Sequence, residues 1–301
     1  MAGSGIEVWR GGGNAWQCDQ MGHLNVRFYV AHAAEAVVGL AHALGMTGAF
    51  SPRGSATLAV REHHIRFLKE ARVGDPLHMT CGLLGIEDAS ARALFVLVHS
   101  GKDAPAAVFQ TRLDHVASAD ARRFPWSHSA LKRADALAVV IPEGLGPRSL
   151  DPGAPIALPR LAEAEAAGLF AYGAGAFGPE HCDVFGRVAA HQLMARLGDG
   201  APHGIAAIRD AAGEHMGLAV VEYRLTYLDH PRAGDRFVVR TGLVRAAPRR
   251  LEWAYWMFDP ASGAPLAAAR AVMVPFDLEA RKATTLPDEV VTKLRAKLVE
   301  F

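Results

Sequence analysis

Hydrophobic and polar positions divide the first half of the chain into one helix and a series of strands. The alanine-rich residues from Val30 to about Leu44 end near two glycines, which predicts a helix. A weak strand pattern at residues 6–10 precedes it. Four extended patterns follow, at residues 57–68, 77–86, 93–99 and 106–116. Because the helix is apolar around most of its circumference, we expect a bent antiparallel sheet to wrap around it, which is an α+β arrangement.

The second half of the chain repeats this order. Residues 287–298 predict an amphipathic terminal helix, and it is preceded by strand patterns at residues 218–228, 236–244, 251–258 and 265–274. Two short landmarks also recur. Cys-Asp-x-x-Gly at 18–22 returns at 182–186, and Arg-x-Gly-Asp at 72–75 returns at 232–235. Two landmarks in the same order, at nearly the same spacing, predict a tandem of two similar domains.

The pattern weakens between the two halves. Residues 119–159 contain several X-Pro and Pro-Gly turns and little periodicity. The sequence therefore predicts a first domain at residues 1–120, a proline-rich linker at residues 121–165 and a second domain at residues 166–301, which includes the terminal helix.

The stretch that carries candidate chemistry lies where a polar loop becomes the first helix. Asp19, Gly22, His23 and Asn25 are grouped there. A helix start presents unpaired N–H groups and the positive end of the helix dipole, which suit developing negative charge. Asp19 as a helix cap and Gly22 as a turn residue would explain those two positions without chemistry. The presence of His23 and Asn25 at the same junction between loop and helix favours a functional site.

These residues also carry a family resemblance. The pattern is Asp19-x-x-Gly22-His23-x-Asn25-x-x-x-Tyr29, with Glu35 further along the helix. It resembles the signature of hot-dog-fold acyl-CoA thioesterases of the 4-hydroxybenzoyl-CoA thioesterase type. The resemblance implies two tandem hot-dog domains that hydrolyse an acyl-CoA or acyl-carrier-protein thioester. It implies no metal and no redox cofactor, since the CoA moiety belongs to the substrate.

The resemblance also implies roles for single residues. Asp19 would be the general base or the nucleophile, and the sequence leaves both open. The N–H groups of Gly22 and His23 would polarise the thioester carbonyl, and one such donor typically contributes about 2.7–4 kcal/mol in the transition state. His23 and Asn25 would orient the carbonyl or the water. Tyr29 would pack or line the acyl pocket, and Glu35 would contact substrate or be a partnered glutamate at the rim.

The second copy departs from this pattern. Asp183 and Gly186 are kept, but Arg187 replaces the histidine and Ala189 replaces the asparagine. We therefore expect one competent site on the first helix. The second site would be degenerate or would hold substrate through Asp183 and Arg187. A pairing of Arg187 with Asp183 would make that acid a poor base.

Composition narrows the partners, bound groups and cellular locations to be expected for this protein. Lys and Arg total 32 against 31 Asp and Glu, so nothing calls for a nucleic-acid partner. Three widely spaced cysteines predict neither a disulfide framework nor a zinc site. The start of the chain lacks a signal-peptide pattern, and no apolar run is long enough to span a membrane, so a cytoplasmic protein is expected. The oligomeric state stays open, with further homo-oligomerisation of the fused halves as one option.

Other signals are weaker. Residues 173–178 match G-x-G-x-x-G without a surrounding βαβ unit, which predicts a flexible loop. Strand packing explains Trp253, Tyr255 and Trp256. Two alternatives to a thioesterase stay open: a hot-dog hydratase or dehydratase, and a non-catalytic acyl-CoA binding protein.

Overall fold

The computed structural model describes residues 5–19, 21–200, 213, 216–280 and 282–301. It divides into two compact units. The first contains Met1–Pro147 and Cys182–Met194, and the second contains Arg148–His181 and Ala195–Phe301. The two units are described one after the other.

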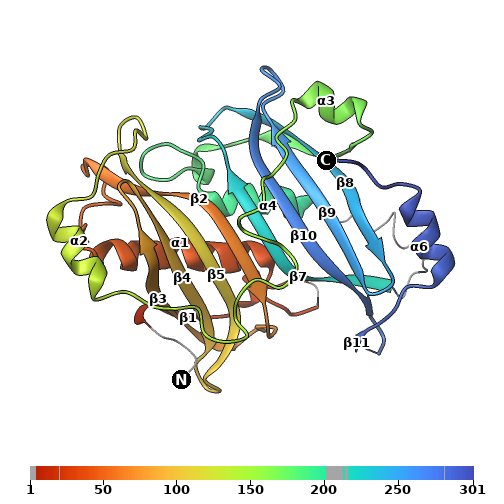
Figure 1. Ribbon diagram of the computed structural model, residues 1–301, viewed down its shortest axis with the longest axis horizontal. Helices are drawn as coiled ribbons and strands as arrows, with labels where there is room; N and C mark the ends of the chain where they lie inside the picture. Colours follow the sequence, from red (N-terminus) through yellow and green to blue (C-terminus); the bar gives the residue numbers. More distant parts are fainter. Residues whose placement is uncertain (1–4, 20, 201–212, 214–215, 281) are drawn as a thin grey trace. The chain divides into compact units, whose positions relative to one another are not determined.

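The first unit is an antiparallel sheet with one long helix against it (Figure 1). The sheet order is β1-β3-β4-β5-β2, and every neighbouring pair is antiparallel. Its elements are β1 (Ile6–Gly12), α1 (Val26–Ala43), β2 (Ala56–Phe67), β3 (Pro76–Ile86), β4 (Ser90–His99), β5 (Ala104–Ala117) and α2 (His128–Asp135). The helix and the five strands were predicted from the sequence, and the structure confirms them.

Helix α1 is buried because its core-facing positions are apolar and small. Val30, Ala33, Ala36 and Leu40 have no exposed surface, and the helix contacts β1, β2 and β3. The approach to β1 is close, since a Cβ atom added at Gly39 would lie 2.8 Å from the carbonyl oxygen of Val8. The sheet can wrap the helix at this distance only because so few large side chains stand between them.

The second unit repeats the architecture. Its sheet order is β7-β10-β9-β8-β6, and the short strand β11 pairs with β10. Its elements are α3 (Leu161–Ala166), β6 (Phe170–Ala176), β7 (Met216–Tyr227), β8 (Arg236–Ala247), β9 (Arg250–Phe258), β10 (Pro265–Asp277), β11 (Lys282–Ala283) and α6 (Asp288–Arg295). Helix α4 (Ala190–Asp199) begins in the segment grouped with the first unit and ends in the second.

The similarity of the two halves also includes the segments after α2 and after α6, where the sequence alone did not show it. After α2, Ala138 forms a parallel bridge with Leu83 of β3, and after α6, Leu298 forms the matching bridge with Leu243 of β8. Both partners are displaced by the same 160 residues. The stretch predicted as a linker thus contains α2 and the start of α3. The residue limits predicted for the two domains stay a prediction.

The connection after α2 is tied to β7 by one buried carboxylate. Glu222 is 1% exposed and accepts the backbone N–H groups of Arg148, Ser149 and Leu150 at 3.0, 2.8 and 3.3 Å. Arg224, two residues along the same strand, donates to the carbonyl oxygens of Asp151 and Ala154. These bonds satisfy main-chain groups that would otherwise lie unpaired beside the sheet.

The prediction of a flexible loop at residues 173–178 is wrong. Gly173 and Gly175 lie in β6, which pairs with β8. A Cβ atom at Gly175 would lie 2.9 Å from the ring of Phe237, so glycine serves close contact here rather than flexibility. Glycine-rich composition alone does not separate these two uses.

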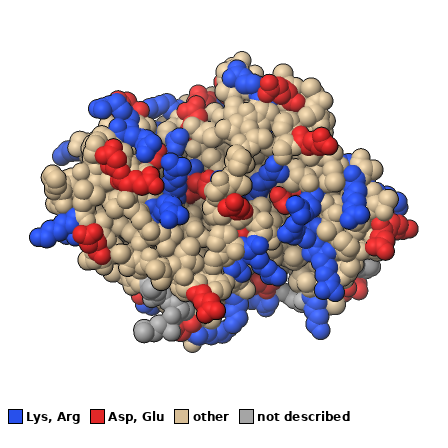
Figure 2. Space-filling view, viewed as in Figure 1, with Lys and Arg blue, Asp and Glu red and all other residues tan. Residues whose placement is uncertain are grey.

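Charged side chains of both signs are mixed on the face drawn in Figure 2, in keeping with their nearly equal numbers. Among the helices that the structure describes, none is long and apolar enough to cross a bilayer.

We expect Glu222→Ala to lower the free energy of unfolding by about 2–4 kcal/mol, because it leaves three N–H groups without their acceptor. Denaturant unfolding measures the loss. Glu222→Gln, which keeps one acceptor oxygen, should lose less. Glu289→Ala removes an exposed carboxylate and serves as the charge control. A loss no larger than that of the control would contradict the anchoring role of Glu222.

Candidate active site

The loop before α1 is closed by one carboxylate oxygen. Oδ1 of Asp19 accepts the N–H groups of Met21 at 2.8 Å and His23 at 3.1 Å. The N–H of Gly22 donates to the carbonyl of Asp19, and Gly22 has a φ of +76°, a conformation that favours glycine. Asp19 is exposed, and its second oxygen, Oδ2, accepts no hydrogen bond from the described residues. One oxygen therefore supports the loop while the other is available.

The second copy has the same loop. Oδ1 of Asp183 accepts the N–H groups of Phe185 at 2.8 Å and Arg187 at 3.0 Å, and Gly186 has a φ of +72°. The acid and the glycine thus perform one structural task in both copies. Their presence alone does not mark a catalytic site, so the difference between the copies lies in their neighbours.

His23 is oriented by a glutamate. Its Nε2 lies 3.1 Å from Oε2 of Glu70, which also accepts from Nη2 of Arg72 at 3.0 Å. The side chain of His23 is 19% exposed. In the second copy the corresponding guanidinium, that of Arg187, is buried and donates to the carbonyl oxygen of Ser118.

The expected pairing of Arg187 with Asp183 takes a different form. The carboxylate of Asp183 accepts the main-chain N–H of Arg187, and the guanidinium lies 5.7 Å from the ring centroid of Phe185. The side chain is directed to the carbonyl of Ser118, which gives the buried guanidinium an acceptor.

Asn25 is the N-cap of α1. Its side-chain oxygen accepts the N–H of Arg27 at 3.0 Å, and its carbonyl accepts the N–H of Phe28 at 2.9 Å. The N–H of Val26, the first helical residue, has no acceptor among the described residues. The first turn carries no acidic side chain that would offset the helix dipole.

The available donor therefore differs from the predicted pair. The N–H groups of Gly22 and His23, which the sequence suggested for the carbonyl, are both used inside the loop. Val26 was missed by sequence reasoning. The signal that identifies it is positional: the first N–H of a helix has no partner within the helix, and here the cap serves the next ones.

Tyr29 is part of the core. It is 5% exposed, its hydroxyl oxygen accepts the N–H of Ala71 at 3.1 Å, and its ring meets Phe67 edge-on at 5.2 Å. Burial raises the pKa of Tyr29 to about 12, so the phenol stays neutral. Tyr29 packs in the core, and its predicted place in the lining of the acyl pocket stays a prediction.

Glu35 belongs to a second polar group, on the middle of α1. Its side chain is 61% exposed, and Oε2 accepts the indole N–H of Trp9 at 2.5 Å. The Trp9 ring packs on buried His32 with centroids 4.2 Å apart, and burial lowers the pKa of His32. Glu35 therefore has a partner in Trp9, and its predicted contact with substrate stays a prediction. Sequence reasoning did not single out Trp9 or His32, because a β1–α1 contact of this kind has no local signature.

The start of α4 adds a further histidine near this group. Burial and the neighbouring Arg27 guanidinium lower the pKa of His191, and Glu35 opposes them. His191 is consequently held towards its neutral form, which avoids a second positive charge beside Arg27.

A family model described as the thioesterase-like superfamily matches residues 14–135 and 177–294. The chain belongs to the thioesterase-like superfamily. Each matched region contains one copy of the acid–glycine loop, so the internal repeat seen in the sequence is a repeat of the family unit itself. The predicted hot-dog fold, its tandem arrangement and the thioester-hydrolase class are thereby confirmed.

Solved structures of similar fold span nearly the whole length of this thioesterase-like chain. A putative oleoyl thioesterase from Lactobacillus plantarum matches with a TM-score of 0.69 at 11% identity, covering 95% of this chain and 99% of its own. A 12:0-ACP thioesterase from Umbellularia californica matches with a TM-score of 0.65 at 13% identity, covering 88% and 92%. At such low sequence identity, the structural similarity establishes a shared fold. No curated protein matches the sequence significantly.

We expect Tyr29→Phe to lower the free energy of unfolding by about 1–2 kcal/mol, because the buried N–H of Ala71 loses its acceptor. Denaturant unfolding measures this loss, and KM for an acyl thioester should stay close to that of the parent protein. An unchanged stability together with a raised KM would show instead that the hydroxyl contacts substrate.

Proposed function

We propose that this protein hydrolyses the thioester of an acyl-CoA or an acyl-carrier protein at the entrance of α1. The observation that carries the proposal is the coincidence of two unused groups at one loop–helix junction. These are Oδ2 of Asp19, which can take a proton or attack a carbonyl, and the N–H of Val26, which can stabilise an oxyanion. His23, Asn25 and Glu70 are present beside them in the first copy only.

The reaction can proceed by general-base catalysis. Oδ2 of Asp19 accepts a proton from water while the water oxygen attacks the thioester carbon. The carbonyl oxygen becomes an oxyanion that receives the N–H of Val26 at the positive end of α1. When the intermediate collapses, the C–S bond breaks and the proton on Asp19 passes to the departing thiolate. The products are a carboxylic acid and the pantetheine thiol.

Nucleophilic catalysis uses the same groups. Oδ2 of Asp19 attacks the thioester carbon, the C–S bond breaks, and a mixed anhydride forms on Asp19. The departing thiolate takes a proton from solvent, and the later hydrolysis of the anhydride returns one. Water then hydrolyses the anhydride and restores the carboxylate. Both routes balance without a metal or redox cofactor. His23, positioned by Glu70, would orient the carbonyl or the water in either route.

The acyl group is proposed at the level of a class. Two proteins of similar fold are named as a putative oleoyl thioesterase and a 12:0-ACP thioesterase. These names support a fatty acyl thioester as the substrate of this protein. A panel of acyl-CoAs of increasing chain length, followed by thiol release, tests the proposal directly. Hydration of an enoyl-CoA without thiol release would favour a hydratase, and CoA-ester binding with neither reaction would favour a binding protein.

We expect Asp19→Asn to lower kcat by about 10²–10⁴-fold, because the amide cannot act as base or nucleophile. The amide oxygen can still accept the N–H groups of Met21 and His23, so the loop should keep its shape. Asp183→Asn is the matched variant, since Asp183 makes the same loop bonds. It should alter KM at most.

Thiol release under saturating substrate distinguishes the two variants. Loss of kcat in Asp183→Asn with normal turnover in Asp19→Asn would reverse the assignment of the two copies. Equal turnover in both variants and the parent would remove the aspartates from the mechanism.

We expect Val26→Pro to lower kcat by about 10²–10³-fold with little loss of stability. Proline removes the N–H that would bind the oxyanion, yet it is favoured at the first position of a helix. The preceding Asn25 has φ −66° and ψ 140°, which a following proline allows.

Ala190→Pro is the matched control, because Ala190 is the first residue of α4 in the second copy. It should leave kcat unchanged. The two variants are compared by steady-state kinetics and by denaturant unfolding. A fully active, stable Val26→Pro protein would show that another group binds the oxyanion.

A further inference from the structure

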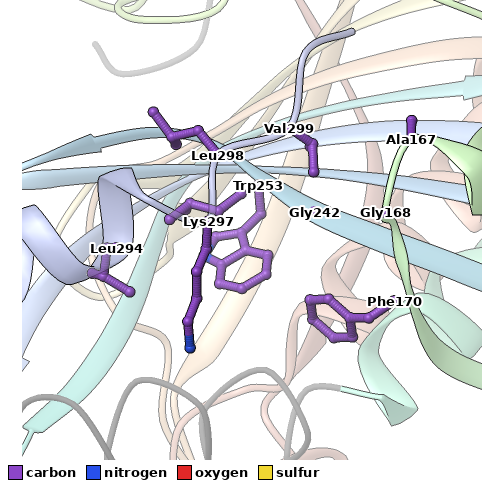
Figure 3. A pocket seen from close by; sticks show the side chains of 10 residues that line it. Ala167, Gly168, Phe170, Gly242, Trp253, Leu294, Lys297, Leu298 and Val299 are labelled. Carbon is purple, nitrogen blue, oxygen red and sulfur yellow. The ribbon is translucent and has the colours of Figure 1, made fainter.

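The second unit contains a cavity of about 520 Å³ beside the end of α6. Its walls come from the segment between α3 and β6, from the start of β6, from β8 and β9, and from the end of α6 with the chain that follows it (Figure 3). The volume lies within the ~300–1,000 Å³ range of small-molecule sites. Every residue that lines it belongs to the second unit, so it is not built from the α1 loop.

The side chains that line the cavity are apolar except for Lys297. Phe170, Leu294 and Leu298 supply apolar surface, and the ring of Phe170 meets that of Trp253 edge-on at 6.0 Å. Trp253 is 5% exposed, and its indole nitrogen has almost no accessible surface, so the residue contributes its ring to the wall. In Figure 3 the indole lies between the Phe170 ring and the side chain of Lys297. The cavity therefore combines apolar walls with one ammonium group, that of Lys297.

The matching place in the first repeat is different. By strand register, Trp253 opposite Leu243 corresponds to Ala93 opposite Leu83. At the same displacement of 160 residues, Lys297 corresponds to Leu137, which is only 8% exposed. The fold therefore requires neither the indole nor the ammonium at these positions. Both side chains are additions of the second repeat.

We propose that this cavity binds an apolar small molecule that carries a carboxylate. The carboxylate would accept a hydrogen bond from Nζ of Lys297, and the apolar part would lie against Phe170, Leu298 and the ring of Trp253. An anion suits the site because the one charged side chain in its lining, Lys297, is positive. Apolar walls select for a hydrocarbon or aromatic body rather than for a polar metabolite.

This proposal is independent of the proposed hydrolysis, because it assigns no step to the cavity. Decanoate is the probe, and decanol, which has the same chain without the charge, is its neutral partner. Calorimetric titration of the full chain at pH 7 should show decanoate binding. Lys297→Leu, which copies the first repeat, should weaken decanoate about tenfold and leave decanol unchanged.

Lys293→Leu is the matched control. It removes the same charge one turn earlier on α6, from a side chain that does not line the cavity. Decanoate affinity should stay at the parent value in this variant. It should also stay there in Asp19→Asn, which separates this site from the proposed catalytic one.

Indole N–H resonances locate the bound probe. The chain has five tryptophans, and the resonance missing from Trp253→Phe identifies Trp253. Decanoate should shift that resonance in the parent protein, and Trp253→Phe should bind decanoate more weakly. The proposal is overturned if decanoate does not bind, if Lys297→Leu and Lys293→Leu have equal effects, or if the Trp253 resonance does not move.

Discussion

Enclosure of an apolar helix by a curved sheet is the constraint on which the first unit depends. Val30, Ala33, Ala36 and Leu40 of α1 have no exposed surface, so the helix cannot exist without the strands around it. The loop that precedes such a buried helix must find hydrogen-bond partners for its backbone N–H and C=O groups close by. The loop at Asp19 meets that need with a single carboxylate oxygen.

The same requirement separates structural from chemical capacity at the entrance of α1. The loop consumes Oδ1 of Asp19 and the N–H groups of Gly22 and His23, and the cap consumes the N–H of Arg27. What is left over is Oδ2 of Asp19 and the N–H of Val26. Function is therefore proposed for the groups that folding does not use, rather than for every polar group in the motif.

Local pattern was sufficient to predict the secondary structure because burial in this fold follows strand and helix periodicity. The predicted helix and strands of the first half correspond to α1 and β1–β5, with ends displaced by a few residues. Glycine-rich β6 was misassigned, since sequence does not show that Gly175 faces the ring of Phe237. A glycine indicates flexibility only where no other residue fills the space that a side chain would take.

Features that depend on long-range contacts were beyond the sequence. The three N–H groups held by Glu222 lie more than 70 positions away in the chain, and the bond from Trp9 to Glu35 joins β1 to α1. Sequence reasoning identified Asp19 correctly as a loop residue but could not say which of its oxygens is occupied. Strand packing accounted for the burial of Trp253 and gave no indication of the space beside it.

The presence of both loops in one polypeptide has an evolutionary consequence. In a symmetric homodimer a single codon specifies both copies of a residue, so a substitution at one site is imposed on the other. In this chain His23 and Arg187 are encoded separately, although both stand in the same loop geometry. Two family units in one chain thus allow the second loop to differ from the first, while the shared aspartate and glycine close both loops in the same way.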